Sequence, residues 1–97
     1  MGIREELSES YGDDLLFADG YDGAIIGVAI GIDSGRVVYS IPKMIHLCSA
    51  SSDMDYTESL EWLEYNTFCA YVGDNTPIYF NDVPKFNWLL ASSLTIL

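Results

Sequence analysis

One stretch early in the chain alternates large and small side chains and constrains the fold more than any other feature. Residues 24–32 place four branched aliphatic side chains at every second position, with glycine or alanine between them. These four are Ile26, Val28, Ile30 and Ile32. A period of two is typical of a strand with one bulky face. We expect that face to lie on the core and the bare face to allow close approach of another backbone.

A tight turn follows this strand. Ser34 and Gly35 are a two-residue turn candidate, so residues 36–41 are predicted to return as a second, antiparallel strand. Asp33 and Arg36 flank the turn and are expected to pair across it. The two segments together predict a β-hairpin.

The strongest helix signal lies in the second half of the chain. Asp55 is a good N-cap, and Glu58 three residues later gives a variant of the capping box. The predicted helix runs over residues 56–72, with Gly73 as the residue that ends it. We expect this to be the principal helix.

Weaker signals complete the predicted elements. A short helix is expected over residues 3–11, and another, of residues 43–47, after Pro42. Residues 76–80 are predicted to be a third strand. The last twelve residues, 86–97, fit either helical or strand spacing.

These elements predict an α+β fold with a three-stranded, mainly antiparallel sheet, one principal helix packed on it, and short N-terminal and C-terminal elements. The helix is expected to cross the sheet face formed by Ile26, Val28, Ile30, Val37 and Tyr39. By length the chain is one domain. It divides into an acidic arm (1–20), a core (21–82) and an apolar segment (83–97).

Charge restricts the possible partners. Fifteen acidic and four basic residues give a formal net charge of −11, while a hydrophobic fraction of 49% is too high for a disordered acidic tail. Such a surface repels nucleic acid and anionic membranes and attracts basic protein surfaces. No stretch reaches the roughly 20 apolar residues that a membrane-spanning helix needs.

Catalytic and metal-binding patterns are not evident. His46 is the single histidine, and no serine or cysteine stands at a recognised spacing from it. Asp19, Asp22 and His46 lack metal-ligand spacing. Cys48 and Cys69 are interpreted as reduced core thiols. We therefore expect no enzyme activity, no cofactor and no metal.

The predicted principal helix carries a candidate binding surface. Glu58, Glu61 and Glu64 wind along one side, and Tyr65 and Phe68 project among them. Trp62 is expected at the edge of the opposite, apolar side. The alternative is that neighbouring segments cover both aromatic rings.

Two further sites complete the candidate set. Asp13 and Asp14 of the acidic arm are added as partner-binding residues. Asn66 is expected on the buried side of the helix, with its amide bonded to the backbone of residues 20–23.

A set of short motifs extends over residues 21–80: 21–28 (YDGAIIGV), 38–39 (VY), Lys43, Ile45, 54–56 (MDY), 64–66 (EYN), 70–73 (AYVG) and 76–78 (TPI). In these motifs the chain resembles a small family of uncharacterised phage-associated proteins. The resemblance implies a phage or prophage origin and the host cytoplasm, and it brings no catalytic residues.

Two functions remain open at this stage. The first is a phage-encoded inhibitor that binds a host nucleic-acid-handling or defence protein with a basic surface, by mimicking nucleic acid. The alternative is a homodimeric accessory or structural protein that associates through residues 86–97.

Overall fold

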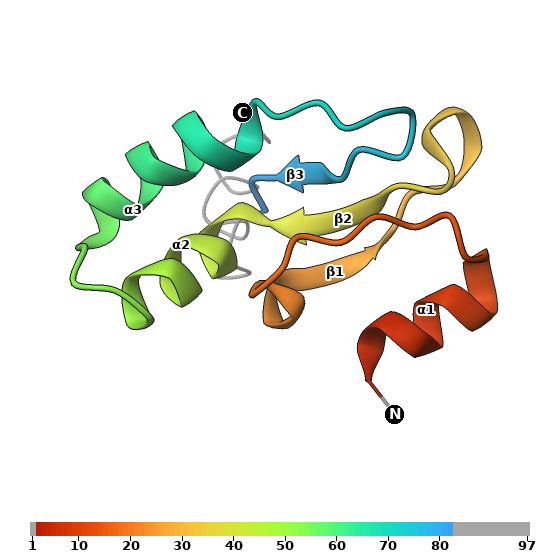
Figure 1. Ribbon diagram of the computed structural model, residues 1–97, viewed down its shortest axis with the longest axis horizontal. Coiled ribbons are helices and arrows are strands. Elements are labelled where there is room, and N and C mark those ends of the chain that lie inside the picture. The colour runs from red at the N-terminus through yellow and green to blue at the C-terminus, as the bar shows by residue number, and fades with distance from the viewer. Residues whose placement is uncertain (1, 83–97) are drawn as a thin grey trace, which may run out of the picture.

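The computed structural model describes residues 2–82, in which three helices lie beside a three-stranded sheet (Figure 1). The main elements are α1 (Ile3–Tyr11), β1 (Ile25–Val28), β2 (Val37–Ser40), α2 (Ile41–Ala50), α3 (Tyr56–Leu63) and β3 (Ile78–Phe80). Three short turns accompany them, η1 (Asp22–Ala24), η2 (Gly31–Asp33) and η3 (Glu64–Phe68). The α+β class is as predicted. The predicted C-terminal element and dimer segment lie outside the described residues.

The sheet is mixed, so the prediction of a mainly antiparallel sheet is wrong. Its order is β1-β2-β3, with β1 antiparallel and β3 parallel to the central strand β2. The chain between β2 and β3 passes through α2 and α3. A crossover of this length returns the chain in the same direction, whereas an antiparallel neighbour needs only a tight turn.

The strand predicted over residues 24–32 is shorter and faces differently. Ile25 pairs with Tyr39 while Gly27 pairs with Val38, so the register shifts between them. Such a bulge changes which side chains share a face. Ile26 consequently points away from the core, and the chain leaves the sheet after β1, with Ile30 79% and Ile32 fully exposed. Of the four residues predicted to form the bulky core face, Val28 alone packs against the core.

The turn between β1 and β2 is wider than a two-residue hairpin. Residues Gly31–Asp33 form a 3-10 turn. The predicted pair is present, since Arg36 Nη1 lies 3.0 Å from Asp33 Oδ1. This ion pair spans the turn and does not join two residues that pair across the strands.

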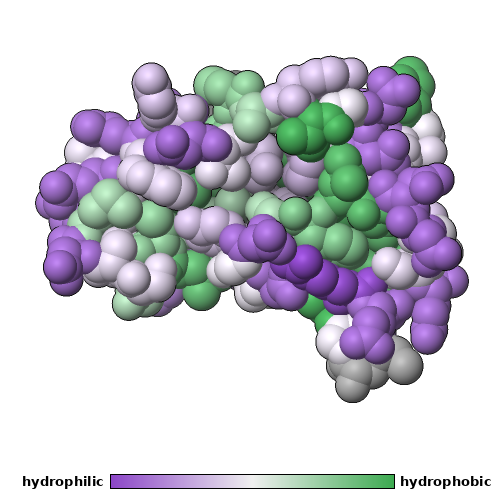
Figure 2. All heavy atoms as spheres, in the orientation of Figure 1, coloured by the Kyte–Doolittle hydropathy of each residue, from purple (hydrophilic) through white to green (hydrophobic). Residues whose placement is uncertain are grey.

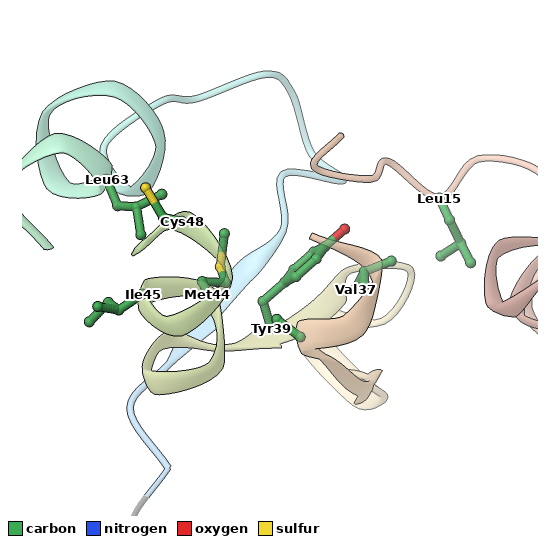
Figure 3. Close-up of a cluster of buried hydrophobic side chains, with 8 residues drawn as sticks. Leu15, Val37, Tyr39, Met44, Ile45, Cys48 and Leu63 are labelled. Carbon is green, nitrogen blue, oxygen red and sulfur yellow. The ribbon is translucent and has the colours of Figure 1, made fainter. Parts of the chain in front are cut away.

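The core lies between the sheet, α2 and the segment that follows α1. Its buried side chains are Leu15, Ala24, Val37, Tyr39, Met44, Ile45, Cys48 and Leu63 (Figure 3). After α1 the chain crosses in front of the strands, and α2 lies at one end of them (Figure 1). Leu63 of α3 meets Cys48 of α2 in this core.

No single helix dominates the fold. The three α-helices contain nine, ten and eight residues, and α3 packs mainly against α2. The predicted packing of a principal helix across the sheet is therefore wrong, because the segment after α1 covers that face. Leu15 and Phe17 supply this cover.

Helix ends with strong local signals are where they were predicted. α1 ends at Tyr11, followed by Gly12 with a φ of 101°. The capping box of α3 is present: the backbone N–H of Glu58 donates to Asp55 Oδ1 at 2.9 Å, and that of Asp55 donates to Glu58 Oε1 at 3.0 Å. α2 is longer than predicted and begins before Pro42, with Ser40 as its N-cap.

The far end of α3 differs from the prediction. Regular α-helix stops at Leu63, the π-helical turn η3 follows, and Cys69 is the C-cap in place of the predicted Gly73. In an α-helix Phe68 would point about 140° away from Leu63. Five residues make little more than one turn of a π-helix, so Phe68 returns toward the core and its ring centroid lies 4.9 Å from that of Tyr79.

Tyr39→Phe is expected to lower the free energy of unfolding by about 1–3 kcal/mol, because the backbone N–H of Ala18 loses its acceptor. Urea unfolding measures the loss. The matched control is Tyr79→Phe, since the Tyr79 hydroxyl makes no hydrogen bond among residues 2–82. Equal losses for the two variants would contradict this role of Tyr39.

Candidate functional site

The outer side of α3 and η3 carries exposed carboxylates and exposed aromatic rings together. We call Glu58, Glu61, Trp62, Glu64 and Tyr65 the acidic aromatic surface. Each of them lies three or four positions from at least one other, a spacing at which the Cβ atoms on one helix face are about 5–6 Å apart. Tyr65 is 88% and Trp62 44% exposed. Large rings left in water beside charges are typical of a binding surface.

The predicted helix residues do not all belong to this surface. Glu58, Glu61, Glu64 and Tyr65 are exposed. Phe68 is partly buried against the core, so the prediction that it projects among the glutamates is wrong. Trp62, predicted only at the edge of the apolar side, takes the place of Phe68 as the second exposed ring.

The acidic arm lies apart from this surface. Asp13 and Asp14 are exposed and follow α1. α1 and α3 lie toward opposite ends of the view (Figure 1). The seven predicted partner-binding residues therefore do not form one surface.

Arg4 attaches α1, at the start of the acidic arm, to the rest of the fold. Arg4 Nε donates to both carboxylate oxygens of Asp22, at 2.9 and 3.0 Å, and Nη2 lies 3.2 Å from Asp19 Oδ1. Its guanidinium also lies 5.0 Å from the centre of the Phe17 ring. The hydrogen bond to Asp22 is the main reason that the Arg4 pKa is raised. Because α1 has no buried residue, these contacts and Leu7 attach it to the fold.

Most of the negative charge remains unpaired. Within residues 2–82, the ion pairs join Arg4 to Asp19 and Asp22, and Arg36 to Asp33. The glutamates of α3 pair with no cation of this part of the chain. Among the described residues, therefore, no cation competes with an external partner for their charge.

A cavity of about 280 Å³ opens beside the acidic aromatic surface. Its walls come from the segment after α1 (Phe17, Asp19, Tyr21), from α3 and η3 (Trp62, Asn66), and from β3 (Tyr79). Apolar side chains gather over the middle of this face, with hydrophilic ones around them (Figure 2). None of the seven predicted site residues lines the cavity.

The tyrosines of the cavity are uncharged at neutral pH. Burial, and then the side chain of Cys48, raise the pKa of Tyr21 to about 12. Burial also raises the pKa of Tyr79. Asp19 is the one carboxylate among the described lining residues, and its side chain is 96% exposed.

Asn66 does not have the predicted environment. It is exposed at the cavity wall, and its Nδ2 donates to the backbone oxygen of Trp62 at 2.9 Å, not to residues 20–23. The Trp62 carbonyl that accepts this bond lies just before the π-helical turn η3. The second cysteine differs as well: Cys48 is buried, but Cys69 is exposed, so it is not a core thiol.

Residues 2–82 bring no three His, Cys, Asp or Glu side chains together as a metal site. Their helices are all too short or too polar to cross a membrane. No known protein family, curated protein or solved structure matches this chain.

Alkaline pH is expected to destabilise the fold through the buried tyrosines. Below pH 10 they are protonated in both states and add no pH dependence. Above it the unfolded chain loses protons first, so the free energy of unfolding falls until the folded pKa of Tyr21, about 12, is passed. Urea midpoints across this range measure the decline. Tyr21→Phe should reduce it and the exposed-site control Tyr65→Phe should not; a flat profile would contradict the argument.

Proposed function

We propose that this chain is a phage-encoded acidic inhibitor that binds a host nucleic-acid-handling or defence protein. The observation that carries the proposal is the acidic aromatic surface, in which Tyr65 and Trp62 are exposed beside Glu58 and Glu61. The proposed partner has a basic surface, and the chain acts there by binding and not as an enzyme. The proposed place of action is the host cytoplasm.

The two kinds of side chain have different roles in this proposal. Unpaired carboxylates attract a basic surface over about 8 Å at physiological salt and speed encounter. Exposed aromatic rings bury large apolar areas once contact is made and slow dissociation. Nucleic acid binds the same basic surfaces through its phosphates. A carboxylate-bearing protein seated there excludes nucleic acid without resembling it in shape.

Charge also favours a different molecule over a second copy as the partner. Two copies that each carry a net charge of −11 repel each other wherever their glutamates would meet. The acidic aromatic surface is therefore better suited to a basic protein than to self-association.

Competition with a DNA duplex for purified bacterial nucleases and DNA-binding proteins tests the proposal. The chain should displace labelled duplex from its target, and Glu61→Lys with Glu64→Lys should weaken displacement at least about tenfold. Glu58 stays unchanged because it completes the capping box.

The matched control is Glu6→Lys with Glu9→Lys, which changes net charge equally and at the same spacing, but on α1. Displacement should fall far less in this control. Equal effects of the two double variants, or no displacement from any target, would contradict a role for the surface on α3.

Binding kinetics should separate the roles of charge and ring. The association rate should fall steeply between low and physiological salt, while the dissociation rate changes little. Glu61→Gln should mainly slow association and Tyr65→Ala should mainly speed dissociation, as measured by surface plasmon resonance on the displaced target. Phe68→Ala should instead lower stability, because its ring packs on Tyr79. An affinity independent of salt would exclude electrostatic steering.

A further inference from the structure

The cavity and the acidic aromatic surface share a residue. Trp62 belongs to the surface and lines the cavity, so a partner seated on α3 lies at the cavity mouth. At about 280 Å³ the cavity is just below the range of about 300–1,000 Å³ that is usual for small-molecule sites. Its size suits one inserted side chain better than a free ligand.

The cavity walls are suited to a flat cation. Phe17, Tyr21, Trp62 and Tyr79 all contribute aromatic rings, and Asp19 contributes a carboxylate. A guanidinium group over an aromatic face gains about 0.5–2 kcal/mol, most when water is excluded. No lysine or arginine is among the described residues that line the cavity.

Two of these walls already hold a guanidinium group. Phe17 lies under the guanidinium of Arg4, and Asp19 Oδ1 accepts from Arg4 Nη2. Arg4 makes its closest contacts with Asp22, and Asp19 Oδ2 accepts no hydrogen bond within residues 2–82. A carboxylate has about four acceptor positions, so Asp19 retains capacity for a second donor.

We infer that the cavity accepts an arginine side chain of the basic partner. This rests on the proposed function and adds the group that the partner inserts. The guanidinium stacks between aromatic walls and donates to Asp19, while the partner backbone stays on the acidic aromatic surface. Arginine is favoured over lysine because its planar group both stacks and forms directed hydrogen bonds, whereas the ammonium group is more strongly hydrated.

Nuclear magnetic resonance on the full ¹⁵N-labelled chain tests the inference with a defined probe. The probe is the blocked pentapeptide Gly-Gly-Arg-Gly-Gly; its analogues carry lysine or citrulline, the neutral isostere of arginine. The arginine peptide should shift the Trp62 indole N–H and the amides of Asp19 and Ala70. The citrulline peptide should bind at least about tenfold more weakly, because it lacks the charge.

Two substitutions locate the binding. Ala70→Phe places a large ring in the cavity lining and should weaken arginine-peptide binding at least about tenfold. Ala50→Phe makes the same change at the exposed end of α2, outside the cavity, and should have no effect. If Ala70→Phe does not fold, the comparison of arginine and citrulline peptides on the unchanged chain decides.

The outcomes separate this inference from the proposed function. Shifts confined to the outer side of α3, with Asp19 and Ala70 unchanged, would overturn the arginine site and leave the inhibitor proposal in place. Equal binding of the citrulline peptide, or no binding, would also overturn it. The proposed function is tested separately, by whether Glu61→Lys with Glu64→Lys weakens competition with the DNA duplex. That result does not depend on the arginine site.

Discussion

The fold depends on Tyr39, which joins two of the three parts that form the cavity. Its ring is fully buried in the central strand β2, and its hydroxyl accepts from the backbone N–H of Ala18 at 2.7 Å. The ring also lies 5.9 Å from that of Tyr79 on β3. Ala18 belongs to the segment that follows α1, and both Ala18 and Tyr79 line the cavity. One buried side chain therefore fixes the distance between these two walls of the cavity. Trp62 and the end of α3 form the remaining wall. Without this hydrogen bond, the segment after α1 would keep only apolar contacts with the sheet.

Local signals in the sequence were sufficient where a structure depends on a few neighbouring residues. The capping box at Asp55 and the glycine after α1 act through backbone atoms within one helical turn. The bulge in β1 and the parallel position of β3 depend instead on pairing between distant segments. An alternating pattern specifies only that two faces differ; pairing with β2 decides which face is buried. The shift between Ile25 and Gly27 turns Ile26 away from the core, whereas Ile30 and Ile32 are exposed because the chain leaves the sheet after β1.

The candidate site shows the same difference between features set by neighbouring residues and features set by distant segments. Exposure of Glu61 and Tyr65 followed from helical spacing and is seen in the structure. The position of Phe68 did not, because a π-helical turn has no clear sequence pattern and changes the direction of every later side chain. The cavity could not be predicted from the sequence because it forms between segments that are distant in the chain, such as those of Tyr21 and Trp62. Trp62 gave the one available signal, since it lay at the border between the apolar and polar sides of the predicted helix.

The charge distribution makes folding and binding respond oppositely to salt. The glutamates of α3 have no cationic partner within residues 2–82, and those of α1 lie toward the other end of the fold. Repulsion among them opposes the compact state, and salt screens that repulsion. Salt also weakens the contact of Arg4 with Asp19, but the bifurcated hydrogen bond from Arg4 Nε to Asp22 and the Phe17 ring hold the same group. Screening should therefore stabilise the folded chain overall while it removes steering toward a basic partner. A loss of binding at high salt would then report on the surface of α3 and not on unfolding.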